Sequence, residues 1–273
     1  RVYKHYYYII GGENNMDSER YRVYTTKDTI FLTKLEKDIL DFSKDYTVHH
    51  WRIPAMISGE ILEKCGYFES MPNQLTGTGY FDEKNCIEII EGNKKNNLTF
   101  SSENMYLTPA ACIHFYPELK KEKLKNELIT TNARVYRHED GKFGRYRLWD
   151  FNVREFVAVG SKEFVVNFLQ DFRQKALNLT KKYKIKSSIV VANDHFYPSK
   201  KNKIKEKVQK VNSLKYELIG NDEVALASFN FHGYHFSKTF DFDEDGKIVT
   251  GCVGFGLDRW IELVKNFNSE YRI

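Results

Sequence analysis

Side chains that could bind a nucleotide recur along one short segment of the chain. The segment reads as two strands joined by a polar, glycine-containing loop from Asp140 to Tyr146. Because side chains at positions i and i+2 of a strand lie on the same face, this hairpin would gather charged and aromatic groups on one side. These groups are Arg137, Glu139, Arg147, Phe151 and Glu155.

The residue types in this hairpin suit the parts of a nucleotide. Guanidinium groups bind phosphates, and an aromatic ring can stack on a base. At roughly 3.3 Å per residue, Phe151 and Glu155 lie about 13 Å apart, which is the reach from an adenine ring past its α-phosphate to a small attached group. The spacing therefore predicts a nucleotide at the Phe151 end of the strand and its reaction partner at the Glu155 end.

The composition is that of an ordinary globular domain. The 273 residues can bury one large core, and 29% of them are charged and 41% hydrophobic. No apolar run approaches the roughly 18 residues needed to cross a bilayer, so we expect no membrane partner. Residues 1–10 lack the order of a signal peptide, and a start at Arg1 rather than Met indicates processing or trimming.

The cysteines indicate the cellular compartment, and the net charge bears on the kind of partner. The four cysteines are widely spaced and form no Cys-x-x-Cys pair, which favours a reducing compartment and a cytoplasmic protein. The net charge of +5 permits an acidic partner without requiring one.

Periodicity predicts the elements that position the hairpin. Ser58 is a predicted N-cap for a short helix that Gly66 ends. Helices are expected over 31–46, 120–127, 162–177 and 257–267, and strands over 67–71, 134–160 (the hairpin), 187–191 (buried), 214–219, 224–231 and 248–253. Hairpin-linked strands with helices between them predict an α+β domain, an antiparallel β-sheet flanked by helices.

Two motifs resemble signatures of the class II aminoacyl-tRNA synthetases. Arg-x-Glu at 137–139, followed by a loop and then Arg-x-x-x-Phe at 147–151, resembles the second motif of that superfamily. Gly-x-Gly-x-x-Arg at 254–259 resembles the third motif, and Gly66-Tyr67 with Pro72 resembles the first. In the superfamily the first motif forms the dimer interface. The resemblance therefore implies a class II synthetase-like sheet and a homodimer.

A closer resemblance is to the amino acid:[carrier protein] ligases, which are truncated homologues of the atypical, methanogen-type seryl-tRNA synthetases. A series of short stretches in one order along most of the chain carries it. One tripeptide of this kind is a weak signal, whereas the ordered series is a strong one. The stretches are 54–58 with 62–67, 107–112, 137–139, 153–157, 192–194, 228–232 and 252–256.

In that family a zinc ion is held by Cys, Glu and Cys, and the matching residues here are Cys112, Glu155 and Cys252. Two thiolates and a carboxylate leave a fourth position open, which is the pattern of a catalytic zinc site rather than a structural one. The resemblance implies that the open position takes the amino group of the substrate. On spacing alone, the two cysteines also read as small buried hydrophobic residues.

The resemblance also assigns roles in ATP binding. As catalytic residues, Arg137 would bind the α-phosphate and the amino acid carboxylate, and Arg259 would stack on the adenine or hold the γ-phosphate. The other contacts would be Glu139 with the adenine amino group, Phe151 beneath the adenine, and Arg145 or Arg147 on the outer phosphates. Without the resemblance, each arginine reads as a surface ion pair and Phe151 as a core aromatic residue.

Alternation along residues 228–232 divides one strand between core and site. Phe229 and Phe231 should face the core, so Ser228 and Asn230 should face the site, where they could bind substrate or ATP.

Glu217 is the candidate carboxylate for the Mg²⁺ ion that accompanies ATP. Here the chain departs from ordinary seryl-tRNA synthetases, in which a carboxylate precedes the Ser/Asn strand more closely. Val224 and Ala225 stand at the equivalent place.

A lysine-rich run spans residues 200–210, within the segment 178–213 that we expect to be a basic partner-binding insertion. The run reads either as a solvated face or as a dock that steers an acidic carrier protein by charge. It has few interleaved aromatic residues, which disfavours tRNA as a partner. We expect residues 1–273 to form a single catalytic domain, with residues 1–50 as an N-terminal αβ segment.

Together these features predict an AMP-forming ligase. It would use ATP to convert a small amino acid to an aminoacyl-adenylate and pass the aminoacyl group to the phosphopantetheine thiol of a carrier protein, with Zn²⁺ and Mg²⁺ as cofactors. Two alternatives stay open. One is a compact, seryl-type enzyme that aminoacylates tRNA, and the other is a catalytically silent synthetase-like module that binds ligands or regulates a partner.

Overall fold

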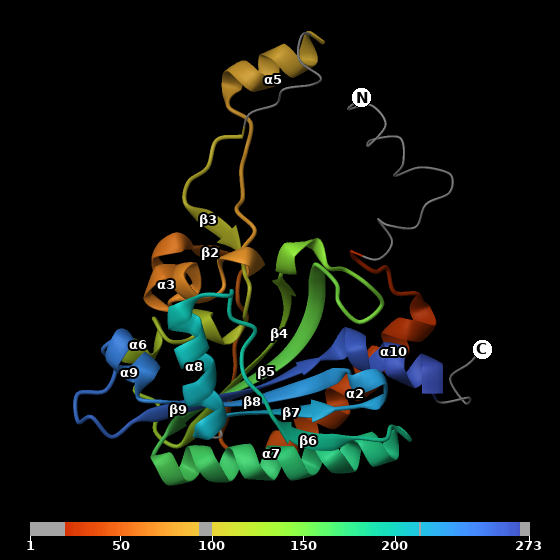
Figure 1. Cartoon of the computed structure of the whole chain (residues 1–273), viewed down its shortest axis with the longest axis vertical. Helices are drawn as coiled ribbons and strands as arrows, with labels where there is room; N and C mark the ends of the chain where they lie inside the picture. The colour runs from red at the N-terminus through yellow and green to blue at the C-terminus, as the bar shows by residue number, and fades with distance from the viewer. Residues whose placement is uncertain (1–19, 93–99, 213, 268–273) are drawn as a thin grey trace.

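A seven-stranded sheet forms the centre of the computed structural model, which describes residues 20–92, 100–212 and 214–267 (Figure 1). The strand order is β1-β4-β5-β9-β8-β7-β6. All neighbouring strands run antiparallel except at one edge, where β1 (Val48–His50) pairs parallel to β4 (Glu127–Tyr136). The predicted α+β fold on an antiparallel sheet is confirmed, apart from this parallel edge. The first 19 residues of the expected N-terminal segment lie outside the described residues.

The predicted hairpin lies in the middle of the sheet. β4 pairs with β5 (Asp150–Gly160) from Glu127↔Val159 to Tyr136↔Asp150. The other strands follow in order: β9 (Val249–Gly256), β8 (Ala225–Gly233), β7 (Lys215–Ile219) and β6 (Ser188–Val191). β6 is an edge strand, so the expectation of a buried strand over 187–191 is wrong: Val190 and Val191 are 40% and 47% exposed.

One face of the sheet packs on helices and forms the main core. Helix α7 (Lys162–Lys182) runs along this face, together with α2 (Thr26–Leu40) and α10 (Leu257–Phe267) (Figure 1). Phe156, Phe229 and Phe255 point into this core and are at most 1% exposed. Alternate residues of a strand face opposite sides of the sheet. The residues next to each of these phenylalanines in its own strand therefore point to the other face.

Short elements cover the other face at one end of the sheet. They are β2 (Met56–Ser58), α3 (Gly59–Lys64), α4 (Tyr67–Ser70), β3 (Met105–Leu107) and the 3-10 turn η4 (Cys112–His114). Ser58 caps α3 as predicted, because its hydroxyl accepts a hydrogen bond from Ile61 N at 3.4 Å. Gly66 ends α3 with a left-handed φ of 74°.

The expected strand over 67–71 is wrong, because α4 occupies this stretch. The left-handed Gly66 redirects the chain after α3, and Tyr67 then turns into the core while Phe68 and Glu69 point outward. Two adjacent outward residues fit a helical turn and not the alternation of a strand.

The remaining elements connect these layers. The helix expected over 31–46 begins at Thr26, after a capping box formed by Thr25 and Asp28, and ends at Leu40. The helix expected over 120–127 is the shorter α6 (Leu119–Glu122), and the chain enters β4 at Glu127. The other short elements are η2 (Asp41–Ser43), η3 (Pro72–Gln74), α5 (Glu83–Ile90), α6 (Leu119–Glu122), η5 (Glu139–Gly141), α8 (Lys200–Val211), η6 (Asn221–Glu223) and α9 (His235–Thr239). Within the described part of the chain, no helix has the length and apolar character needed to cross a bilayer.

Candidate active site

A cleft opens on the face of the sheet opposite α7. Strands β5, β7, β8 and β9 form its floor, and the loop between β4 and β5 (residues 137–149) and the start of α10 form its rim. The structure brings most of the predicted site residues into this cleft: Arg137, Glu139, Arg147, Phe151, Glu155, Glu217, Ser228 and Arg259.

Strand register explains why residues distant in sequence meet on the floor. Glu155 lies opposite Gly254, Gly254 opposite Ser228, and Ser228 opposite Glu217, so they form one row across the sheet. Directly opposite residues share a face of the sheet. The next row on this face, two residues along, contains Cys252, Asn230 and Lys215.

The structure brings together the three residues that were predicted as metal ligands. The ligand atoms of Cys112, Glu155 and Cys252 all lie within 4.8 Å of one another, and all three residues are buried. Gly254 leaves the room that the carboxylate needs, since a Cβ there would lie 2.6 Å from Glu155 Oε2. Asn230 donates a hydrogen bond to Cys252 Sγ at 3.4 Å and so orients the sulfur.

Because these residues are buried, the ionised forms of Glu155 and Cys252 are unfavourable without a nearby positive charge. Desolvation raises the pKa of Glu155 to about 7, although Cys252 and the Arg137 charge oppose the shift. The neighbouring Cys112, burial and Glu155 raise the pKa of the Cys252 thiol well above its ordinary value. A divalent cation among these atoms would favour their ionised forms, and two sulfurs with one carboxylate are a donor set that zinc takes. The residues present therefore fit the metal.

Arg137 lies between the metal-type group and the aromatic end of the floor. It follows the last residue of β4, and its Nε donates to Pro109 O at 2.8 Å. Its guanidinium carbon lies 5.5 Å from the centre of the Phe151 ring, within cation–π range. The same charge opposes the rise that burial causes in the pKa of Glu155. Arg137 can thus reach a ligand that spans from Phe151 to Glu155.

Glu139 departs from the expected strand geometry. It lies in the turn η5 with a positive φ of 48°, which is uncommon for a residue with a side chain. Glu139 lines the cleft because the backbone turns at this point. The prediction had placed it there by alternation with Arg137 along a strand. In the structure Glu139 Oε2 pairs with Arg147 Nε at 3.0 Å. The contact of Glu139 with the adenine amino group and that of Arg147 with the outer phosphates remain predictions.

Arg259 links the rim to the floor from the first turn of α10. Its Nε donates to Tyr146 O at 2.8 Å, and its Nη1 donates to Ala225 O at 3.0 Å. Burial lowers the pKa of this guanidinium. The side chain therefore supports the rim loop as well as lining the cleft.

The cleft floor also contains a lysine that was not among the predicted site residues. Lys215 Nζ lies 2.8 Å from Asp194 Oδ1 and 3.3 Å from Glu217 Oε1. Although burial opposes it, these two carboxylates raise the pKa of Lys215, so the ammonium is charged. The alternation of Lys215 and Glu217 along one strand face was the available signal. A Mg²⁺ ion on Glu217 would have to share that carboxylate with the ammonium.

Comparisons with known proteins give relatives of two kinds and solved structures with the same fold. No family model matches the chain. The chain is 28% identical over 235 residues to amino acid--[acyl-carrier-protein] ligase 1 of Bradyrhizobium diazoefficiens, a match that covers 76% of this chain and 68% of that protein. It is 27% identical over 234 residues to type-2 serine--tRNA ligase of Methanococcus aeolicus, covering 76% of this chain and 45% of that protein. The fold also matches M. kandleri seryl-tRNA synthetase, solved with A. aeolicus tRNASec, with a TM-score of 0.71, 18% identity, and 91% and 54% of the two chains covered.

The sheet and its flanking helices are therefore those of a class II aminoacyl-tRNA synthetase, as the signature motifs predicted. The chain is a homologue of the amino acid--[acyl-carrier-protein] ligases and of the type-2 serine--tRNA ligases, which agrees with the resemblance that its motifs carry. The relatives on both branches are ligases, which supports an enzyme of that class. The chain spans less than half of the type-2 serine--tRNA ligase that it matches.

Proposed function

We propose that this protein activates a small amino acid with ATP and transfers the aminoacyl group to a carrier protein. The observation that carries the proposal is the arrangement along β5. Arg137, Phe151 and Glu155 line the same cleft, and Glu155 also belongs to the buried group that it forms with Cys112 and Cys252. An aminoacyl-adenylate has matching parts: a base, a phosphate, and an amino group.

Arg137 would act at the centre of the first step. The amino acid carboxylate attacks the α-phosphorus, the bond to the bridging oxygen of pyrophosphate breaks, and pyrophosphate leaves. The Arg137 guanidinium would hold the carboxylate and an α-phosphate oxygen together, so that the reacting atoms start close to one another. Phe151 would hold the adenine, and Ser228 and Asn230 would line the amino acid side of the cleft.

Cys112, Glu155 and Cys252 would hold a zinc ion. Bound there, the ion would supply an open coordination position for a neutral amino group and so favour amino acids over plain carboxylic acids. Asn230 would keep the Cys252 sulfur in place through its 3.4 Å hydrogen bond. Mg²⁺ would accompany ATP, with Glu217 as the candidate carboxylate.

Helix α8 supports a carrier protein as the second substrate. Its inner side is anchored, because Asn202 bonds the backbone at Ser70 and Tyr197, and Gln209 donates to Asp194 Oδ2 at 2.7 Å. Asp194 in turn pairs with Lys215 on the cleft floor. The outer side is exposed and basic, with Lys200, Lys201, Lys203, Lys207 and Lys210. Asp194 thus connects this basic surface to the cleft floor. Such a surface suits an acidic carrier whose thiol arm must reach the adenylate.

The proposed enzyme is a homodimer. The stretch from Gly66 to Pro72, which resembles the first class II motif, lies in the described structure as α4 and the start of η3. Phe68 there is 39% exposed, and Met56 on neighbouring β2 is 48% exposed. A dimer would cover such side chains. Sedimentation analysis at several protein concentrations tests this assignment, and a monomer at all of them would contradict it.

ATP–pyrophosphate exchange with a panel of amino acids tests the proposal. We expect exchange with one or a few small amino acids. Absence of exchange with every amino acid, in zinc-loaded protein, would favour the silent module. Where exchange occurs, the purified enzyme is then offered a phosphopantetheinylated carrier protein and tRNA in parallel. Loading of the carrier supports the proposal, and loading of tRNA instead would favour the seryl-type alternative, which the type-2 relatives keep open.

A further inference from the structure

The rim loop is hydrogen-bonded to a segment near the start of the described residues. Residues 20–25, which we call the strap, precede α2 and contact the loop between β4 and β5. Trp149 N donates to Arg20 O at 2.7 Å, and Arg22 Nη2 donates to Arg145 O at 3.3 Å. The strap thus contacts the rim loop, and none of residues 20–25 lines the cleft.

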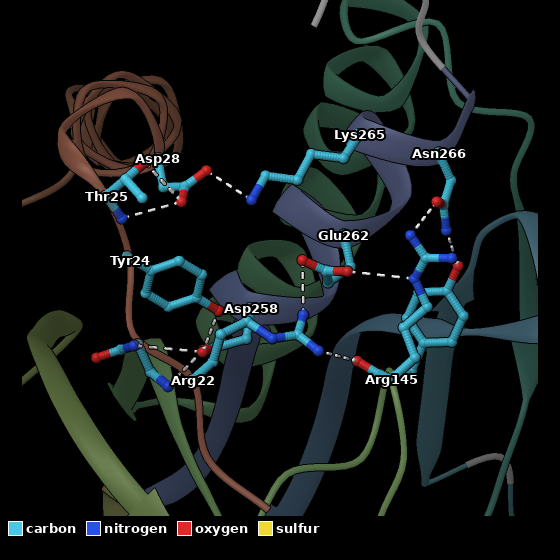
Figure 2. A network of polar contacts seen from close by, with 11 residues as sticks. Arg22, Tyr24, Thr25, Asp28, Arg145, Asp258, Glu262, Lys265 and Asn266 are labelled. Atoms are coloured by element: carbon cyan, nitrogen blue, oxygen red, sulfur yellow. Dashed lines mark hydrogen bonds and ion pairs between the residues drawn. The ribbon is translucent and has the colours of Figure 1, made fainter. Parts of the chain in front are cut away.

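Glu262 of α10 bridges the strap and the rim (Figure 2). One carboxylate oxygen lies 2.6 Å from Arg22 Nη1, and the other lies 3.2 Å from Arg145 Nε. Arg145 also donates to Asn266 of the same helix. Glu262 is 6% exposed, so its carboxylate is largely shielded from water. Figure 2 shows Glu262 between the two guanidinium groups.

The bridge lets two cations lie side by side at the edge of the cleft. Without the carboxylate, Arg22 and Arg145 would repel each other, and the flexible Arg145 side chain would sample other positions. With it, two of the three Arg145 nitrogens are fixed against α10. Arg145 still lines the cleft, and its side chain remains 52% exposed. Fixing such a side chain in advance lowers the entropy lost when a ligand binds.

We propose that Glu262 is a positioning residue that sets Arg145 for the outer phosphates of the bound nucleotide, with Arg22 as its support from the strap. This inference rests on the proposed nucleotide site. It makes Arg145, rather than the Glu139-bound Arg147, the rim arginine that is ready for the β- and γ-phosphates.

A second ion pair of α10 provides a control for an effect on the stability of the fold alone. Lys265 lies one turn beyond Glu262 on α10 and pairs with Asp28 of α2 at 2.6 Å. This pair also fastens the N-terminal region to α10 but does not contact the rim loop (Figure 2). Lys265→Met therefore removes an ion pair of the same helix without touching Arg145 or the capping box of Thr25 and Asp28.

Calorimetric binding of ATP and of AMP to the full chain separates the roles. We expect Glu262→Gln to weaken ATP binding roughly tenfold, the effect of one well-placed charge-assisted contact, and to leave AMP binding within about twofold. Arg22→Met should act in the same direction with a smaller change. Lys265→Met should leave both affinities unchanged. Tighter ATP binding by Glu262→Gln would mean that the carboxylate competes for Arg145, which would overturn the proposal.

A double-mutant cycle tests whether Glu262 acts through Arg145. In an Arg145→Met background, Glu262→Gln should have no further effect on ATP affinity. Additive losses, or equal losses for ATP and AMP with a lowered melting temperature, would show a structural role only and contradict the inference. If ATP and AMP bind as expected but exchange fails with every amino acid, the proposed function is wrong while this inference stands. If ATP does not bind, both are wrong.

Discussion

The two ends of strand β5 are held in different ways. At the Glu155 end the side chain stands on a strand with neighbours on both sides, is 6% exposed, and meets two buried cysteines. At the Phe151 end the floor meets a loop whose arginines are exposed and paired: Arg147 with Glu139, and Arg145 with Glu262. The Glu155 end is fixed by the sheet, whereas the Phe151 end depends on side-chain pairs.

This difference suits two different ligands. A small amino group needs a site of fixed size, which strands and buried ligands supply. A nucleotide must enter, and pyrophosphate must leave, so charged groups on a loop are better placed to exchange partners. We infer that recognition of the amino acid lies at the fixed end of β5 and that handling of ATP lies at the loop end.

The largest effect is expected from breaking the fixed end. Cys252→Ser should remove zinc and lower exchange on the order of 10³-fold or more, because it takes away one of the three proposed ligands. Zinc content by mass spectrometry and exchange rate check it together. Cys86→Ser, at an exposed cysteine on α5, is the matched control and should change neither. Retained zinc with full exchange in Cys252→Ser would contradict the metal assignment.

Arg137 joins the two ends, so its replacement should come next. Arg137→Lys keeps the charge but loses the planar fork, and we expect exchange to fall about 10²-fold, comparable to loss of one transition-state donor. Zinc content should stay at the wild-type level. A loss of zinc in this variant would show that Arg137 stabilises the metal-type group rather than the reaction.

The sequence predicted the arrangement of β5 because alternation alone sorts Phe151 and Glu155 onto one face and Phe156 onto the other. The meeting of Cys112 with Cys252 followed only from the resemblance, since residues so far apart carry no local signature. Lys215 and Glu262 were not predicted because Asp194, which pairs with Lys215, and Arg22 and Arg145, which pair with Glu262, come from other segments of the chain. The strand wrongly expected at Tyr67 shows that a left-handed glycine can redirect a short segment.

A smaller effect is expected at the loop end. Phe151→Leu should raise the KM for ATP roughly tenfold, since stacking of a base on an aromatic ring contributes about 1–3 kcal/mol. The KM for the amino acid should change little. Phe143→Leu is the control, because Phe143 stacks on Trp149 on the rim and does not line the cleft. Equal changes in both KM values for Phe151→Leu would contradict the division between the ends.

The smallest effect on activation is expected on α8. Reversing charge at Lys203 and Lys207 together should leave exchange unchanged but lower kcat/KM for carrier loading roughly tenfold at low salt, mainly through slower association. The difference should shrink as salt rises. Lys181→Glu, an exposed change on α7, serves as control. An unchanged kcat/KM for the carrier would mean that the lysines of α8 are only a solvated face.

The division of labour along β5 is tested most directly by one pair of substrates. Exchange is measured in zinc-loaded protein with the preferred amino acid and with the same acid lacking its α-amino group. The account predicts that the amino acid supports exchange and that the des-amino acid does so at least about 10³-fold less efficiently, because it cannot fill the position beside Cys112, Glu155 and Cys252. Comparable exchange with both acids would contradict the claim that the Glu155 end recognises the amino group.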